Sequence, residues 1–441
     1  MLKSIKINEL FGQFNYDIQF KPAGITIITG PNGFGKSTIL KIIEAVAEKD
    51  LYEVCMFEFS DLEFTLENGK TFSISKKGKR AIINGIELDM YPKKIMDSWK
   101  RRHGLPFIER IGPDLYLDAR YEKLLTFDEV QELRAKAEED VIKDKLIATN
   151  YEEARQTKKD STKFKELFNE YDSFKKNIGQ IKFIKEQRLI RQEIKDEGRY
   201  YSDEKASIVE TISELPKKMK EKIKTKILEY SETASKLDST YPRRLFDASE
   251  EISQSDYLEE IGEIILKQEK IEDFGLIKDI KQISPMSYKA EHSKALKVFL
   301  NDTNKKLSVF DDFVAQLDLF VNIINSKLTY KKLVLSNEFG LKVVKENGDE
   351  LSLTKLSSGE QQIIVLFFEL IFETNNKLVL MIDEPEISLH VAWQRELMDD
   401  FRKTVEIKND SLSIIIATHS PQVINNSWNL TVDLGAKNGD L

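Results

Sequence analysis

Two clusters of chemically distinctive residues lie near opposite ends of this chain of 441 residues, about 320 positions apart. The first cluster is a glycine-rich run at 30–38, between a short β-branched segment and a helical pattern. The second cluster comprises residues 356–360, 378–384 and 417–420. If one core contains both clusters, the residues between them must be an insertion, and this requirement limits the possible folds more than any other feature does.

Composition is that of a globular protein with many exposed charged side chains. Hydrophobic residues make up 41% and charged residues 32%, a balance typical of folded rather than disordered chains. The net charge of -8 excludes a uniformly basic surface, so contact with nucleic acid would need a local patch. The lone Cys55 excludes an intrachain disulfide and a zinc site built of several thiolates.

The sequence contains no pattern typical of a membrane protein. No apolar run approaches the ~18 residues that a membrane-spanning helix needs. The segment before Lys36 has the apolar pattern of two strands, which is unlike a cleavable signal peptide. We therefore expect a cytoplasmic protein without membrane contact.

Alternating and β-branched residues predict strands on both sides of the glycine-rich run. Residues 2–30 have the pattern of a strand pair, and residues 38–47 that of a helix. Asn-Gly pairs at 68–69 and 347–348 each separate two short runs of alternating apolar residues. Such pairs favour tight turns, so we expect a β-hairpin at each position and an antiparallel β unit after the first helix.

Charge-rich helical patterns fill most of the chain between the two clusters. Residues 119–180 and 190–329 carry apolar side chains at spacings of three and four, and a short apolar strand separates the two segments. Strict heptads do not persist, and Pro216, Pro242 and Pro285 interrupt the pattern, which predicts a short arm that is coiled coil only in part. The expected domains are an N-terminal half of the core at 1–118, a helical insertion at 119–329 with a core strand and loop near 181–189, and a C-terminal half at 330–441.

Residues 30–37 satisfy the pattern Gly-x-x-x-x-Gly-Lys-Ser, after a predicted strand and before a predicted helix. Glycines let the backbone curl so that its N–H groups point at phosphate oxygens, and the helix N-terminus adds positive potential there. Lys36 should reach the β- and γ-phosphates, and Ser37 should bind Mg²⁺. A chance match in a glycine-rich turn would lack the flanking strand and helix. The pattern thus predicts a site for ATP and Mg²⁺, whose loop residues are Asn32, Gly33, Gly35, Lys36, Ser37 and Thr38.

Two further strands should deliver polar residues to the same edge of the sheet. One apolar run ends in Asp383 and Glu384, and ligands bind at the carboxyl ends of parallel strands in open α/β sheets. Asp383 is then placed to hold Mg²⁺, and Glu384 to orient and deprotonate an attacking water. Two acids at a strand end are otherwise solvated charges, so this assignment depends on Lys36. The β-branched run 412–417 delivers His419, a candidate sensor of the γ-phosphate.

This set of motifs resembles the ABC ATPase superfamily, in its soluble branch of SMC-like and OLD-like heads. The resemblance implies an α/β fold: a P-loop NTPase head of the ABC type, with a mixed sheet, an antiparallel β subdomain and an inserted helical, partly coiled-coil arm. Residues 356–360, Leu-Ser-Ser-Gly-Glu, are similar to the family signature Leu-Ser-Gly-Gly-Gln, from which Ser358 and Glu360 depart. By that similarity Ser357, Ser358 and the amide of Gly359 would contact ATP held by a second subunit, which implies a head-to-head homodimer or a higher oligomer.

Two further similarities concern loops beside the expected site. Gln187, in the run 183–189, resembles the Q-loop glutamine of the family, which would contact Mg²⁺ and the attacking water. A glutamine after a short strand is otherwise a surface residue. Residues 385–390, Pro-Glu-Ile-Ser-Leu-His, are similar to the D-loop, which crosses the dimer interface in that family.

A narrower resemblance involves residues 356–361, 383–390 and 417–422, which are similar to OLD-like AAA-type ATPases of bacterial anti-phage systems. In the Septu and PARIS systems such an ATPase works with a nuclease of the HNH or the Toprim type. The resemblance implies a switch subunit that holds or activates a separate nuclease effector, with nucleic acid or a phage protein as a trigger. Neither a His-Asn-His zinc cluster nor room for a Toprim domain after His419 is visible, so we expect the nuclease to be another polypeptide.

Two other functions are compatible with a head of the ABC type. An SMC-like DNA repair or chromosome-maintenance ATPase would bind DNA directly, but such proteins usually carry long, regular coiled coils. A transporter subunit would have its signature much closer to the P-loop.

Two basic stretches bear on the DNA-binding alternative. Residues 76–102 include nine basic and three acidic side chains, and six lysines within 217–226 are opposed only by Glu221. Either stretch could bind phosphates through counterion release. A charge run is more often a solvated face.

Overall fold

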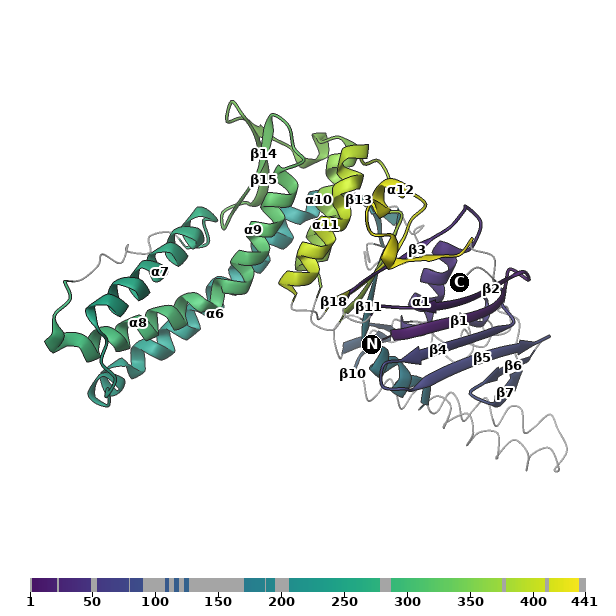
Figure 1. Ribbon diagram of the computed structural model, residues 1–441, viewed down its shortest axis with the longest axis horizontal. Coiled ribbons are helices and arrows are strands. Elements are labelled where there is room, and N and C mark those ends of the chain that lie inside the picture. Colours follow the sequence, from purple (N-terminus) through teal and green to yellow (C-terminus); the bar gives the residue numbers. More distant parts are fainter. Residues whose placement is uncertain are drawn as a thin grey trace. The chain divides into compact units, whose positions relative to one another are not determined.

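The computed structural model comprises two compact units, formed by residues 1–22 with 41–180 and by residues 23–40 with 181–441 (Figure 1). It describes residues 2–21, 24–48, 54–78, 80–89, 108–110, 115–118, 123–126, 170–186, 188–194, 206–277, 287–374, 378–408 and 412–435. Within these ranges, no helix has the length and apolar character that crossing a bilayer requires.

An antiparallel sheet of six strands, in the order β2-β1-β4-β5-β6-β7, forms most of the first unit. Its strands are β1 (Leu2–Leu10), β2 (Phe14–Gln19), β4 (Asp61–Leu66), β5 (Thr71–Lys77), β6 (Arg80–Ile83) and β7 (Ile86–Asp89). The hairpin expected at 68–69 joins β4 to β5, where Gly69 adopts a φ of 78°. A helix at 170–178 packs on this sheet through Phe174, whose ring centroid is 5.1 Å from that of Phe72. The expected antiparallel β subdomain is therefore confirmed.

A smaller antiparallel sheet of the first unit corrects the expectation of a helical segment beginning at 119. Its strands are β8 (Ile108–Arg110), β9 (Leu115–Asp118) and β10 (Lys123–Thr126). Residues 123–126 are extended because they pair with β9 in antiparallel register, so that the backbone hydrogen bonds of this segment are made between strands rather than within a helix. Of the rest of the predicted helical stretch 119–180, residues 127–169 lie outside the described residues.

The predicted strand pair at 2–30 is wrong in its pairing. β1 pairs with β2, whereas β3 (Ile25–Thr29) belongs to a different sheet in the second unit. The burial patterns explain the difference: β1 has buried and exposed residues in near alternation, but the first four residues of β3 are all buried. A strand that is buried on both faces is typical of a parallel sheet covered by helices.

The second unit contains a sheet of five strands in the order β11-β17-β18-β3-β19. The additional strands are β11 (Gln180–Ile184), β17 (Leu378–Asp383), β18 (Leu412–Ala417) and β19 (Thr431–Asp433). The last residue of β17, Asp383, pairs with Ala417 of β18, and Ala417 pairs in turn with Ile28 of β3, always in parallel. The carboxyl ends of three strands therefore lie side by side, which confirms the alignment expected from the motifs.

Helices and short sheets complete the second unit. The helices are α1 (Lys36–Glu48, divided between the units after Leu40), α6 (Thr211–Phe246), α7 (Gln254–Asp273), α8 (Ser293–Leu307), α9 (Asp311–Asn325), α10 (Ser358–Phe372), α11 (Val391–Ile407) and α12 (Pro421–Ile424). The further strands are β12 (Ile190–Ile194), β13 (Ala206–Glu210), β14 (Lys331–Ser336), β15 (Gly340–Lys345) and β16 (Glu350–Leu351). Figure 1 shows α8 running beside α6 and α7, and Arg244 of α6 forms a bidentate ion pair with Asp302 of α8.

The helices of the predicted insertion share one apolar core with the parallel sheet. This core includes Ile212 of α6, Leu317 of α9, Phe367 of α10 and Ile416 of β18. The boundary between the two compact units accordingly does not fall at the expected domain limits of 118 and 329.

Two of the three prolines expected to interrupt the arm lie inside one long helix. α6 contains both Pro216 and Pro242 within 36 residues, which corresponds to about 54 Å of helix. A proline in a helix interior costs about 3 kcal/mol. The burial of Leu215 and Met219 on either side of Pro216 offsets that cost. Pro285 lies outside the described residues.

The hairpin β14–β15 packs against α6 at a position that requires glycine. Gly340, at the start of β15, has a φ of 77°, and a Cβ atom there would collide with the carbonyl oxygen of Pro216. The Asn-Gly turn expected at 347–348 is present between β15 and β16, and Gly348 has a φ of 85° with no atom near the position of a Cβ.

Gly340→Ala should lower the free energy of unfolding by about 3 kcal/mol or more, because the methyl group adds a backbone clash to an unfavourable φ. Gly348→Ala is the matched control and should cost about 1 kcal/mol, since only the φ is unfavourable there. Chemical unfolding of both variants checks this expectation. Equal losses would show that the contact with Pro216 does not govern the packing of the hairpin.

Candidate functional site

The glycine-rich loop follows β3 directly and curls around Lys36, the first residue of α1. Gly33 and Gly35 have φ values of 86° and 89°, which glycine adopts without strain. The ammonium group of Lys36 is buried and donates hydrogen bonds to the carbonyl oxygens of Gly30 at 2.9 Å and Pro31 at 3.3 Å. The loop thus presents an ammonium group and a helix N-terminus at one point, a donor set suited to phosphate.

Two of the predicted Mg²⁺ ligands come together at the end of β17. The hydroxyl of Ser37 donates a hydrogen bond of 2.9 Å to Oδ1 of Asp383, across 346 positions of sequence. Hydroxyl and carboxylate oxygens are ligands that Mg²⁺ prefers. The residues present therefore fit a magnesium ion beside the phosphate-binding loop.

The remaining predicted loop residues flank these groups. Asn32 is exposed, and Thr38 is half-buried in the first turn of α1. Gln187, the predicted Q-loop residue, lies outside the described residues.

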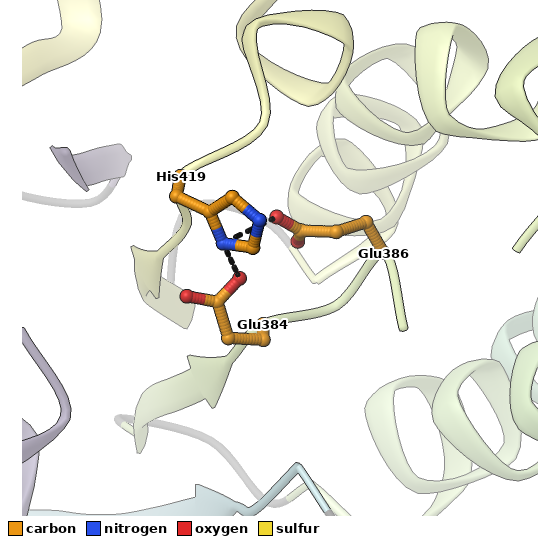
Figure 2. Close-up of side chains that lie close together, drawn as sticks. All are labelled: Glu384, Glu386 and His419. Atoms are coloured by element: carbon orange, nitrogen blue, oxygen red, sulfur yellow. Dashed lines mark hydrogen bonds and ion pairs between the residues drawn. The ribbon is translucent and has the colours of Figure 1, made fainter. Parts of the chain in front are cut away.

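Glu384 turns the chain sharply at the carboxyl end of β17. Its φ of 44° is in the left-handed region, and its backbone N–H donates to the carbonyl oxygen of Ala417 at 2.9 Å. As Figure 2 shows, the Glu384 carboxylate faces the ring of His419, with Oε2 2.7 Å from Nδ1. The strained turn thus directs the carboxylate at the end of the neighbouring strand.

Burial, and after it the neighbouring carboxylate of Glu386, raise the pKa of Glu384, His419 acts in the opposite direction, and the net result is a pKa of about 7. A carboxylate with a pKa near the working pH can accept a proton from a water molecule and release it again. The corner formed by Glu384 and His419 is therefore suited to general base chemistry.

Glu386 is a third member of this corner that motif reasoning did not assign. Its Oε1 accepts a hydrogen bond from the hydroxyl of Thr418 and lies 3.9 Å from Nδ1 of His419. One ligand atom each from Glu384, Glu386 and His419 lies within 4.8 Å of the others, a spacing that a metal ion could also occupy. The signal in the sequence was the second glutamate of Asp-Glu-Pro-Glu, two positions after the predicted base.

The signature-like run begins α10 with a complete capping box. Ser357 is the N-cap, and its hydroxyl accepts a hydrogen bond from the backbone N–H of Glu360 at 3.4 Å. In return, Oε2 of Glu360 accepts from the N–H of Ser357 at 3.0 Å. Ser357 and Ser358 remain exposed. None of their hydrogen bonds among the described residues goes to the phosphate-binding loop at 30–38.

The glutamate at 360 is also explained by an ion pair. Lys331 approaches Oε1 of Glu360 to 2.9 Å. Burial tends to raise the pKa of Glu360, but the hydrogen bonds from Lys331 and Ser357 outweigh it and hold the pKa below its usual value. The residue is therefore ionised, and a glutamine could not make this pair.

Gly359 has no space for a side chain, because a Cβ atom would lie 2.5 Å from the carbonyl oxygen of Ser388. Ser388 has a φ of 62° and belongs to the expected D-loop. The signature-like run thus packs against the expected D-loop of its own chain.

Arg188 is a buried residue beside the motifs that sequence reasoning also missed. Its side chain donates hydrogen bonds to Gln362 of α10 and to the carbonyl oxygen of Pro385. No local pattern marks it, because its partners are 174 and 197 positions away in sequence.

The basic stretches offer less free charge than their composition indicates. Lys222 of α6 donates to the carbonyl oxygen of Phe372 at 2.8 Å and pairs with Glu373 at 3.1 Å. Two more lysines of this stretch, Lys218 and Lys226, pair with acids of α6 itself. Most of the stretch 76–102 lies outside the described residues. Three of the six lysines in the stretch 217–226 are therefore engaged within the chain.

Comparisons with known proteins give matches of different extent. The chain aligns at 32% identity over 113 residues with UvrABC system protein A from Rickettsia typhi and from Rickettsia prowazekii, which is 26% of this chain and 11% of each relative. Among solved structures, an SMC head bound to the C-winged helix domain of ScpA has 13% identity and a TM-score of 0.34, with 96% of this chain and 91% of that chain covered. The SMC head domain from Thermotoga maritima has 12% identity and a TM-score of 0.31, with 96% and 90% covered.

The description AAA ATPase domain belongs to a family model that matches residues 1–424. The matched region includes the phosphate-binding loop, the signature-like run, the acidic strand end and His419. The chain therefore belongs to the family of AAA ATPase domains, and it is an ATP-hydrolysing enzyme.

Proposed function

We propose that the chain is the ATP-driven switch subunit of a bacterial anti-phage defence complex, in which it holds or activates a separate nuclease of the HNH or Toprim type. The observation that supports a switch is that four predicted site residues lie together at one sheet edge, namely Ser37, Asp383, Glu384 and His419. Ser357 and Ser358 of the signature-like run, in contrast, remain exposed. The defence role is supported by the resemblance of residues 356–361, 383–390 and 417–422 to ATPases of such systems.

In the proposed mechanism, Lys36 and the backbone N–H groups of its loop bind the phosphates of ATP. Ser37 and Asp383 would hold Mg²⁺, as would Gln187 by the family resemblance, and the ion would supply positive charge to neutralise the phosphate oxygens. Glu384 orients a water molecule and accepts its proton at the carboxylate. His419 keeps that carboxylate in position through Nδ1 and acts as the sensor of the γ-phosphate.

Glu384→Gln should bind ATP with nearly unchanged affinity but hydrolyse it about a hundredfold or more slowly, because the amide cannot accept the proton of water. Lys36→Ala is the matched control and should lose ATP binding itself. Equilibrium binding of a fluorescent ATP analogue and steady-state phosphate release separate the two effects. Normal turnover by Glu384→Gln would exclude Glu384 as the base.

A second subunit completes the site in this proposal. Ser357 and Ser358 are exposed at the N-terminus of α10, where backbone N–H groups and the helix dipole favour a phosphate. In a head-to-head homodimer these groups would face ATP bound by Lys36 of the partner, so that ATP joins the heads and hydrolysis separates them. That change in the pairing of heads is the signal to the effector.

Mixing Ser357→Arg with Lys36→Ala should restore hydrolysis that neither variant has alone. In a mixed dimer, one site combines the intact loop of one subunit with the intact signature of the other. Random pairing should therefore return up to about a quarter of the wild-type rate, since half of the dimers are mixed and each has one working site of two. Ser357→Arg alone should still bind ATP. A mixture without activity would contradict completion of the site by a second subunit.

A DNA repair or chromosome-maintenance ATPase that binds DNA directly is the second candidate. The alignment with UvrABC system protein A favours it. The ion pairs of Lys218, Lys222 and Lys226 count against it, because they reduce the charge available to DNA phosphates.

Co-expression with a nuclease encoded by a neighbouring reading frame tests the defence role. We expect the tagged chain to co-purify with that nuclease in fixed proportion, and we expect Glu384→Gln and Lys36→Ala to change nuclease activity in opposite directions. A change of nuclease activity in the same direction in both variants would contradict a switch. Salt-sensitive binding of duplex DNA by the chain alone, without any effect on a co-expressed nuclease, would favour the second candidate instead.

A further inference from the structure

Arg188 is a buried cation where three elements of the ATP site meet. It follows β11 in the chain and is only 5% exposed. Its Nε donates a hydrogen bond to the side chain of Gln362 on α10, and its Nη2 donates to the carbonyl oxygen of Pro385 at 2.9 Å. One guanidinium group therefore joins the signature helix to the loop that follows the acidic strand end.

The electrostatic surroundings of Arg188 include Glu386, which belongs to the hydrolytic corner formed with Glu384 and His419. Burial lowers the pKa of Arg188 to about 10, and the carboxylates of Glu369 and Glu386 act against that shift. The guanidinium is therefore charged at neutral pH, although a buried charge destabilises a fold unless other groups compensate it. An apolar side chain would fill the same space at lower cost, so the charge and the planar set of donors indicate a role beyond packing.

Two complementary atoms in these surroundings have no hydrogen-bond partner in the described part of the chain. They are Nη1 of Arg188, a donor, and Oε2 of Glu386, an acceptor, and both are buried. The other carboxylate oxygen of Glu386 accepts from Thr418, the neighbour of His419. A movement that joins Nη1 to Oε2 would add a charge-assisted hydrogen bond and would connect α10 to the His419 corner.

We propose that Arg188 is a positioning residue for ATP hydrolysis, which holds α10 and the loop at 385–386 together and closes onto Glu386 when nucleotide binds. Closure links the helix that carries Ser357 to the carboxylate beside Glu384 and His419. The signature and the hydrolytic corner of one head then move as a single body. This role concerns ATP hydrolysis by the chain itself and is independent of the effector.

Arg188→Lys and Arg188→Met test this role. Both variants should bind ATP with a Kd within about threefold of wild type, because the side chain positions other groups and does not bind the phosphates. Their kcat should fall about ten- to hundredfold, the effect of losing a charge-assisted hydrogen bond that matters for turnover. Arg188→Lys keeps the charge but cannot reproduce the simultaneous hydrogen bonds of the guanidinium to Gln362 and Pro385. A loss of kcat in this variant therefore identifies those hydrogen bonds, and not the charge, as the cause. Calorimetric ATP titration and steady-state phosphate release measure the two constants.

Lys327→Met is the matched control for loss of a buried cation. Lys327 is 3% exposed and pairs with Asp400 of α11 at 2.7 Å, outside the ATP motifs. This variant should lower the unfolding temperature without changing kcat per folded molecule.

The double variant Arg188→Met with Glu386→Gln distinguishes a coupled pair from two independent residues. Its kcat should be no lower than that of the less active of the two single variants, because the two residues act together. Wild-type kcat in Arg188→Lys, strictly additive losses in the double variant, or losses that follow only the folded fraction would each overturn the proposal.

Discussion

The parallel register of β17, β18 and β3 is the constraint on which the ATP site depends. Asp383, Ala417 and Ile28 pair across these strands, so three segments leave the sheet at one level. At this edge of the sheet, the hydroxyl oxygen of Ser37 lies 2.9 Å from Oδ1 of Asp383. The long segment between them adds little cost, because the entropy of loop closure grows only with the logarithm of loop length. The register itself is specified by strands whose residues are buried on both faces.

In the proposed mechanism, the same strand ends also determine the electrostatics of hydrolysis. The left-handed turn at Glu384 and its backbone bond to Ala417 direct the carboxylate toward His419. Burial and the nearby Glu386 favour the protonated carboxyl, while His419 favours the ionised form, and the balance brings the pKa to about 7. A carboxylate with a pKa near neutral pH is a stronger base than one with an ordinary pKa and is still partly ionised, whereas a permanently protonated carboxyl group could not accept a proton. The opposing influences on Glu384 thus leave its carboxylate suited to act as the proposed base.

Local sequence patterns were sufficient for features that local physics determines. The glycine-rich loop, the apolar strand ending in Asp383 and the two Asn-Gly hairpins depend on backbone preferences and on periodicity within a few residues. The pairing of β3, the length of α6 and the place of Arg188 depend on contacts between distant segments. Pro216 is tolerated in α6 because its neighbours Leu215 and Met219 are buried, which no propensity within the helix could reveal. Arg188 likewise gains its surroundings only when α10 and the loop after β17 are assembled around it.

The signature-like run shows how an apparent departure from a family pattern can be a local requirement. Glu360 closes the capping box and forms an ion pair with Lys331, so its charged carboxylate stabilises the N-terminus of α10. The hydroxyl of Ser357 accepts a hydrogen bond within the same capping box. Ser358 and the N–H groups of the helix terminus are therefore available to an incoming phosphate. Gly359 keeps that terminus against the carbonyl of Ser388, within the expected D-loop. In the proposed dimer, therefore, each head would present its signature and its D-loop to the partner as one rigid surface, and a nucleotide that moves either element must move both.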